Sequence, residues 1–309
     1  MRSPLLDLPG AVAADGVDAD VAAHYGDLFA EQRALVKGEA VVDRSNREIV
    51  RIAGVDRLKW LNDLTSQKLD TLQPGEWTQT LILDLQGRVE HHMTLVDDGE
   101  AVLAHVEPGT SEALIDYLDR MRFMLRVEVS GVDDLAVLST ATEDFYVPRG
   151  DHQGKPLAGI WAYEAFRIEQ YRPRLGFDTD HKTIPHEVGW IGSAVHLTKG
   201  CYRGQETVAR VHNLGHPPRR LVFLHLDGSV DTLPPHGAPV IFENQEIGTV
   251  GSSARHYELG PIALAVVKRT VPVDATLLAG GVAAAQEVIV PPDAGRNVQI
   301  DPSLRRRIR

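Results

Sequence analysis

The chain contains a single cysteine, Cys201, among its 309 residues. One thiol excludes an intramolecular disulfide, and it cannot supply the four thiolates of a typical iron–sulfur cluster or four-cysteine zinc site. Basic residues are fewer than acidic ones: the chain has 32 Lys and Arg and 43 Asp and Glu, which gives a formal net charge of −11. Proteins that hold duplex nucleic acid through its phosphates usually carry the opposite balance, so we expect no direct nucleic-acid binding.

Long apolar segments and nucleotide-binding loops are missing as well. No uncharged apolar run reaches the roughly 18 residues of a membrane span, and residues 1–16 lack the blocks of a signal peptide. We therefore expect a cytoplasmic protein without a membrane partner. The chain has neither a GxxxxGK(S/T) loop nor a GxGxxG loop after a strand, which disfavours nucleotide cofactors. What is present, 43% hydrophobic and 24% charged residues, is typical of a folded protein.

The first half of the chain mixes helical and strand patterns. Helical spacing of apolar residues predicts helices over 21–36, 56–64 (with Asp56 as N-cap) and 110–123. Alternating residues predict strands over 49–52, 77–85, 89–96, 102–106, 126–129 and 135–139, and 142–158 is expected to be a loop. This irregular order favours an α+β fold over a doubly wound parallel sheet.

Glycine and proline divide the second half of the chain. A helix is expected over 205–212, and the break at 215–218 makes a domain boundary. His212 and His216 have the spacing of a helical metal-binding pair, but the helix is broken between them, so we expect no metal site there. Short strands at 221–226, 239–242, 246–252, 261–267 and 287–290 predict a small β-barrel. The predicted segments are an N-terminal extension (1–20), an α+β region (21–217, subdomain boundary near 140–160), the barrel (218–292) and a basic tail (293–309).

The densest group of reactive side chains is KGCYRGQE, residues 199–206. Lys199 and Arg203 bracket Cys201 with positive charge, and a helix is expected to begin directly after it, so both features favour the thiolate. The flanking glycines permit close approach of another molecule. The alternative is that Cys201 is a small buried apolar residue, and the local sequence leaves both interpretations open.

This motif resembles the signature of the YgfZ-like folate-binding proteins, which are related to the aminomethyltransferase (T-protein) of the glycine cleavage system. The resemblance covers about residues 20–292. Further matching segments are VDRS at 42–45, IAGVDRLKWLN at 52–62, LDLQGRV at 83–89 and GTVGS at 248–252. The stretch that approaches the pterin in this family is matched by Arg167-Ile168-Glu169, Pro173, Gly176, Asp178 and Pro185-His186-Glu187.

The resemblance implies a fold and a function. The fold is a split, ferredoxin-like pair of folate-binding subdomains and a C-terminal β-barrel, arranged as a ring around a central channel. The implied cofactor is tetrahydrofolate, and the implied role is that of an accessory protein in iron–sulfur cluster assembly or repair in client enzymes, including tRNA-modifying enzymes. Cys201 is then a reactive group or a transient cluster ligand, and any ligation is shared because one thiol cannot hold a cluster.

Candidate folate contacts follow from the same resemblance. Glu187 is the candidate for two parallel hydrogen bonds to the pterin, with a plain surface carboxylate as the alternative. Tyr202 is expected either to stack on an aryl ring or to lie in the core. Guanidinium groups suit the tail carboxylates. The remaining candidates are Lys199, Gln205 and Glu206 of the motif and the guanidinium groups of Arg167, Arg203 and Arg210.

The central hairpin departs from the aminomethyltransferase. The transferase carries an aspartate there, and His92, or His91 one position away, stands in its place in this chain. Adjacent strand residues point to opposite faces, so only one of the two can face a channel; the other interpretation is a packed or solvent-facing pair. An imidazole can exchange protons near neutral pH, which keeps a folate-dependent aminomethyl or one-carbon transferase as an alternative. The transferase also lacks the KGCYRGQE motif, so the resemblance favours a protein that is not an enzyme. Besides the accessory protein and the transferase, a third hypothesis is a folate-binding regulator with an inert cysteine.

Overall fold

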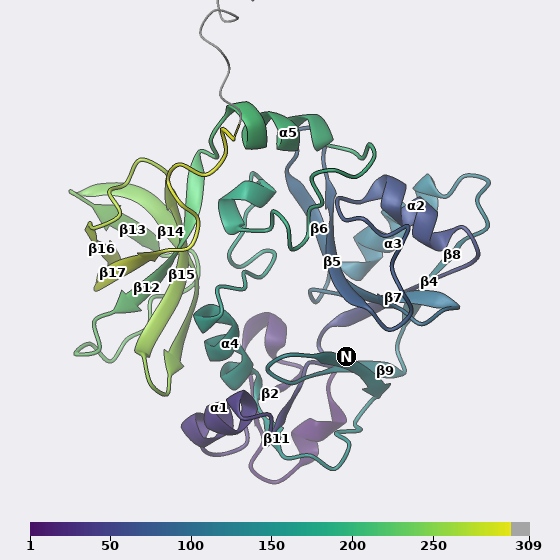
Figure 1. Cartoon of the computed structure of the whole chain (residues 1–309). Helices are drawn as coiled ribbons and strands as arrows, with labels where there is room; N and C mark the ends of the chain where they lie inside the picture. Colours follow the sequence, from purple (N-terminus) through teal and green to yellow (C-terminus); the bar gives the residue numbers. More distant parts are fainter. Residues whose placement is uncertain (298–309) are drawn as a thin grey trace, which may run out of the picture.

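Three bodies arranged as a ring make up residues 1–297, the part of the chain that the computed structural model describes (Figure 1). One body holds a five-stranded sheet, one holds a four-stranded sheet together with the N-terminal segment, and the third is a closed six-stranded barrel. This architecture confirms the predicted α+β class with a barrel toward the C-terminus.

The five-stranded sheet has the antiparallel order β5-β6-β7-β4-β8. Its strands are β4 (Glu48–Ala53), β5 (Trp77–Leu83), β6 (Val89–Asp97), β7 (Ala101–Val106) and β8 (Glu128–Val132), and its helices are α2 (Arg57–Leu64) and α3 (Ser111–Met121). Strand residues alternate between faces, so Met93 and Leu95 of β6 are buried in one core with α2 and α3. His92 and Thr94 face the opposite way, toward the centre of the ring.

The second body is built from segments that precede and follow the five-stranded sheet in the sequence. Its sheet has the order β10-β9-β3-β11, in which β3 and β11 run parallel. The elements are η1 (Pro4–Asp7), β1 (Val12–Ala13), η2 (Gly16–Asp18), β2 (Ala22–His24), α1 (Leu28–Val36), β3 (Val41–Asp43), β9 (Leu135–Ser139), β10 (Asp144–Pro148), β11 (Leu157–Ala158) and α4 (Ile160–Glu169). Chain segments about 100 residues apart therefore meet in one sheet, as the expected split arrangement requires.

Two local predictions in this half of the chain are wrong, and a third is confirmed only in part. Residues 21–36 are not one helix, because β2 comes first and the Asp27 carboxylate then caps α1 by accepting two backbone N–H groups at 3.0 and 2.9 Å. Segment 142–158 is not a loop, because it contains β10 and β11. Asp56 occupies the N-cap position of α2 as predicted, but its side chain makes no cap hydrogen bond, since its carboxylate pairs with Arg126 at 2.8 Å instead.

The barrel closes in the order β12-β15-β14-β13-β16-β17. Its strands are β12 (Arg219–Leu226), β13 (Pro239–Phe242), β14 (Gln245–His256), β15 (Gly260–Lys268), β16 (Thr276–Ala279) and β17 (Val282–Val288). The sequence pattern missed β16 and placed the last strand too late. Two short elements, η3 (Pro185–Val188) and α5 (Gln205–Leu214), connect the barrel to the rest of the ring.

The described chain ends beside α5. The Asn297 N–H donates to the carbonyl of His212 at 3.0 Å, so the segment after the barrel returns to the helix that follows the KGCYRGQE motif. Of the predicted basic tail, residues 293–309, the part from residue 298 onward, with its cluster of arginines, lies outside the described residues. None of the helices in residues 1–297 combines the length and the hydropathy needed to cross a bilayer.

Candidate functional site

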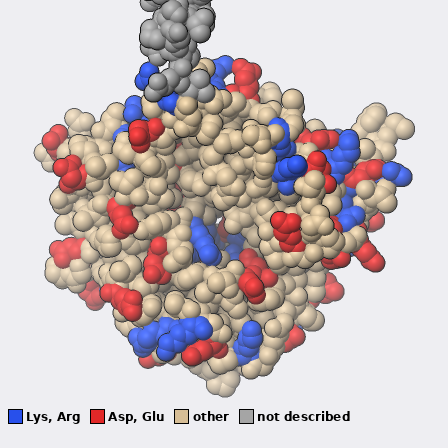
Figure 2. Space-filling view, in the orientation of Figure 1, with Lys and Arg blue, Asp and Glu red and all other residues tan. Residues whose placement is uncertain are grey.

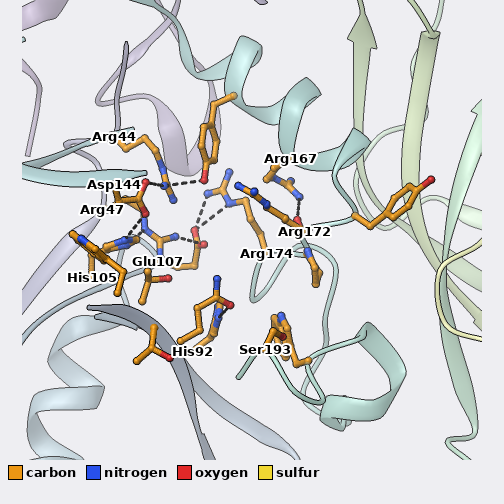
Figure 3. Close-up of a pocket in the computed structure, with 18 of the residues that line it drawn as sticks. Arg44, Arg47, His92, His105, Glu107, Asp144, Arg167, Arg172, Arg174 and Ser193 are labelled. Atoms are coloured by element: carbon orange, nitrogen blue, oxygen red, sulfur yellow. Dashed lines mark hydrogen bonds and ion pairs between the residues drawn. The ribbon is translucent and has the colours of Figure 1, made fainter. Parts of the chain in front are cut away.

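A cavity of about 750 Å³ lies at the centre of the ring. Its walls come from β5, β6 and β7, from the turn between β9 and β10, from α4 with the loop that follows it, and from the loop at 188–193. Figure 2 shows the central hollow with basic side chains at its mouth, and Figure 3 shows the side chains that line it. The five-stranded body and the second body line this cavity, and Ile289, directly after barrel strand β17, completes the lining, which makes the cavity the candidate binding site.

Buried ion pairs cover one wall of the cavity. Arg47 and Arg174 both bind Glu107, the latter at 2.8 Å, and Arg174 also binds Asp18 at 2.9 Å and Glu164 at 3.0 Å. Burial opposes ionisation of Glu107, but the two guanidinium groups hold the pKa of its carboxyl well below the usual range. These arginines are therefore neutralised by the protein itself and join its N-terminal segment to the five-stranded sheet.

His105 extends this network (Figure 3). The Arg47 Nε–H donates to His105 Nδ1 at 3.1 Å, and His105 Nε2 lies 3.0 Å from an oxygen of Asp144. Burial lowers the pKa of His105 to about 4. The imidazole is thus neutral at neutral pH, with its proton on Nε2 facing the carboxylate, and both nitrogens are engaged.

His92 is the member of the histidine pair that faces the cavity. Its ring stacks on Trp190 with the centroids 4.7 Å apart, and its Nε2 lies 3.1 Å from Gln79 Oε1. Burial lowers the pKa of His92 to about 3, so the imidazole stays neutral at neutral pH. With Gln79 Oε1 as acceptor, Nε2 carries the proton and Nδ1 is left as an acceptor. His91 lies on the other face of β6, beside Tyr117 of α3 at a centroid distance of 6.4 Å.

Arg167, predicted to hold the folate tail, lines the cavity but is fully engaged. Its guanidinium donates to Glu164 and Ser252, and to Asp178 at 2.9 Å, and its side chain is 2% exposed. Burial opposes its charge, but the two carboxylates raise the pKa of Arg167 above its usual value. Arg167 therefore joins α4, the loop at 178 and barrel strand β14, and it has no capacity left for a ligand carboxylate.

The KGCYRGQE motif lies outside the cavity. The Lys199 ammonium donates to the carbonyl oxygens of Asn62 and Thr65, at the C-terminal end of α2, and lies 4.8 Å from the centre of the Tyr202 ring. Burial lowers the pKa of Lys199 to about 8. Tyr202 is buried in the core shared with the barrel, so the structure supports the core interpretation for this residue. Lys199 thus attaches the motif to α2.

A contact between two glycines fixes the other end of the motif. Gly204 has a φ of +83° and packs so closely on the β5–β6 turn that a Cβ there would lie 2.6 Å from the carbonyl oxygen of Asp84 and 3.1 Å from the Cα of Gly87. α5 begins at the next residue. Cys201, between the two anchors, is exposed, which excludes the buried apolar interpretation.

The remaining predicted contacts also lie away from the cavity. Glu187 is fully buried, and its carboxylate accepts from Arg219 at 2.9 and 2.8 Å and from a backbone N–H. Arg203 pairs with Glu90 at 2.9 Å on an open groove. The other three predicted residues, Gln205, Glu206 and Arg210, belong to α5. The Gln205 side chain lies 3.5 Å from a backbone carbonyl, and Glu206 pairs with Arg210 at 2.8 Å. Of the ten predicted site residues, the structure brings His92 and Arg167 to the cavity.

Several cavity residues were missed by the sequence analysis. Trp77 and Trp190 provide aromatic walls, and Arg172 and Glu143 provide charges that have no ion-pair partner within residues 1–297. The one available signal was the Arg-Pro-Arg run at 172–174, inside the stretch matched to the pterin approach. Among these described residues, no group of three or more His, Cys, Asp or Glu side chains is arranged to hold a metal ion.

Comparisons with known proteins agree with this architecture. Residues 219–305 match the family of the glycine cleavage T-protein C-terminal barrel domain. An aminomethyltransferase of Rippkaea orientalis is 24% identical over 338 aligned positions, covering 87% of this chain and 90% of that protein. A chloroplastic protein of Arabidopsis thaliana is 23% identical, and the match spans 74% of this chain and just under two thirds, 66%, of that protein.

Two further comparisons concern a solved structure and a second group of relatives. The crystal structure of the glycine cleavage system aminomethyltransferase T from Bartonella henselae superposes with a TM-score of 0.76 at 15% identity, covering 96% of this chain and 98% of that one. A tRNA-modifying protein YgfZ of Vibrio vulnificus is 29% identical over 143 residues, covering 46% of this chain and 38% of that protein. The chain therefore has the fold of the glycine cleavage T-protein, and aminomethyltransferases are among its relatives.

Proposed function

We propose that this protein binds tetrahydrofolate in the central cavity. The observation that carries the proposal is the cavity itself, because its volume of about 750 Å³ falls in the range of small-molecule and cofactor sites. The position agrees with the folate channel implied by the family resemblance. The relatives named aminomethyltransferase support the same cofactor class.

The lining residues fit the chemistry of a folate. Trp77 offers a flat apolar surface to a ring of the folate, and Trp190, almost fully buried beneath the stacked His92 ring, supports the opposite part of the lining. His92 Nδ1 offers an acceptor for a pterin N–H, and its neutral ring places no cation next to the heterocycle. Glu143, whose carboxylate has no cation partner within residues 1–297, can accept two parallel hydrogen bonds from a pterin N–H and amino group. In this proposal Glu143 takes the role that the sequence assigned to Glu187.

Blocking the cavity tests this part of the proposal. Ser193 lines the cavity and is exposed, so Ser193→Trp places an indole in the cavity without disturbing a buried contact (Figure 3). Calorimetric titration with tetrahydrofolate under anaerobic conditions should show saturable binding to the wild type and to the control Ser229→Trp, in an exposed turn of the barrel. Ser193→Trp should weaken binding at least tenfold. Equal affinity in all three proteins would place the folate elsewhere.

We further infer that the folate-bound protein supports assembly or repair of iron–sulfur clusters in client enzymes, including tRNA-modifying enzymes. The observation that favours this role is the position of Cys201, which is exposed between two anchored residues, Lys199 and Gly204. A thiol held in this way is available to a cluster in a partner while the protein itself has no further thiol to complete a site. The YgfZ relative, named as a tRNA-modifying protein, supports the same role.

Replacing the thiol tests the second part. Cys201→Ser removes an exposed sulfur and no packing contact, so we expect unchanged stability and unchanged affinity for tetrahydrofolate. The activity of an iron–sulfur client enzyme in cells that depend on this protein should fall, with Ser229→Ala as the control. Full client activity with Cys201→Ser would remove the thiol from the mechanism and leave a folate-binding regulator with an inert cysteine.

A further inference from the structure

One arginine of the cavity differs from the other four. Arg44 pairs with Asp144 at 3.3 Å, and the guanidinium groups of Arg47, Arg167 and Arg174 each bind at least one buried carboxylate. Arg172 also lines the cavity, yet within residues 1–297 its side chain has neither an ion-pair partner nor a hydrogen bond. Its guanidinium lies over the ring of Phe166, 5.3 Å from the centroid, and this contact leaves the N–H donors available.

The backbone of Arg172 is held firmly while its side chain is not. The Arg172 N–H donates to the carbonyl of Arg167 at 2.8 Å, and the Arg172 carbonyl accepts from the Arg167 guanidinium at 3.0 Å. Tyr171 on one side has a φ of +57°, and Pro173 on the other side restricts the backbone further. The Cα of Arg172 is therefore fixed, and its exposed guanidinium offers unused hydrogen-bond donors at the cavity wall, next to Arg167 in Figure 3.

We propose that Arg172 binds a carboxylate of the glutamyl tail of the folate, an inference that rests on the proposed function. A guanidinium donates two parallel hydrogen bonds to a carboxylate, and its charge is permanent. The four neighbouring arginines are neutralised by the protein, so Arg172 is the lining cation that gives a ligand carboxylate its counter-charge. In this arrangement the pterin lies against His92, and the tail runs toward Arg172.

The test separates the tail from the pterin by titrating each one alone. The ligands are 5-formyltetrahydrofolate, 6,7-dimethyltetrahydropterin, which has no tail, and p-aminobenzoyl-glutamate, which has no pterin. Arg172→Gln should weaken binding of the first and the third about 10- to 100-fold, as loss of a charge-assisted hydrogen-bond pair implies, and leave the second unchanged. The matched control is Arg33→Gln, another exposed guanidinium over an aromatic ring, 5.9 Å from that of Tyr257 and outside the cavity. The control should not change any of the three affinities.

The outcomes distinguish this inference from the proposed function. Wild-type and Arg172→Gln proteins that bind 5-formyltetrahydrofolate equally well would overturn the role of Arg172 and leave folate binding in place. Equal weakening of the tail-free pterin would also overturn it, because the substitution would then act on the whole cavity. A wild type that binds p-aminobenzoyl-glutamate through Arg172 but no folate would support the carboxylate site and contradict the proposed function. Arg172→Lys, which keeps the charge, should restore part of the lost affinity and shows that the loss does not come from misfolding.

Discussion

Gly204→Ala tests the packing that joins the KGCYRGQE motif to the β5–β6 turn. A non-glycine residue at the φ of +83° costs about 1–2 kcal/mol. The added Cβ would lie 2.6 Å from the carbonyl oxygen of Asp84 and 3.0 Å from the Cβ of Leu83, and relieving such overpacking costs about 1–3 kcal/mol more. Neither neighbour can rotate away, because one is backbone and the other is a buried strand residue. The expected loss in free energy of unfolding is about 2–5 kcal/mol.

The assay is urea unfolding followed by tryptophan fluorescence. Trp190 reports on this region, because it shares a core with Tyr202 of the motif. Gly200→Ala is the matched control within the same motif, since a Cβ at Gly200 meets nothing within 4 Å. It should change the free energy of unfolding by less than about 1 kcal/mol. The packing argument would be refuted if Gly204→Ala proved as stable as the wild type, or if the control lost as much stability.

Two further predictions concern other buried groups. Lys199→Met leaves the carbonyls of Asn62 and Thr65 without their donor and should lower the free energy of unfolding in urea by about 2–4 kcal/mol. The control Lys59→Met removes an exposed ammonium of α2 and should lower it by under about 0.5 kcal/mol. Equal losses in the two variants would contradict the anchoring role of Lys199. His92 has a folded pKa of about 3 because of burial, against 6.5 for a free imidazole, so the unfolded chain binds more protons between these values and stability falls as the pH drops below about 6.5. By pH 5 this histidine accounts for a loss of about 2 kcal/mol relative to pH 7, and His92→Asn should remove that part of the pH dependence. A pH profile in the variant parallel to that of the wild type would show that His92 titrates normally in the folded protein.

Much of the fold follows from local patterns, and the errors have a common physical cause. The strands of the five-stranded sheet are long and alternate regularly, so their periodicity identified them. The strands that were missed, among them β2, β10, β11 and β16, have two to five residues each, and pairing with partner strands stabilises them. Local periodicity carries little information about such elements.

The candidate site was less predictable because its residues act through distant contacts. The sequence analysis singled out the motif at 199–206, but in the structure its lysine and second glycine contact α2 and the β5–β6 turn, more than 100 residues away in the sequence. Strand alternation established that only one of His91 and His92 can face a channel, and the structure selects His92. No local pattern distinguishes Arg172 from Arg167, since the difference lies in which of them already has carboxylate partners.

A crystal structure of the protein with a bound reduced folate tests the central claim most directly. The cavity at the centre of the ring should contain the ligand, with a ring against Trp77, an acceptor contact from His92 Nδ1 and a tail carboxylate at Arg172. A folate bound in another pocket or groove of the protein, with the central cavity unchanged, would contradict the proposed function.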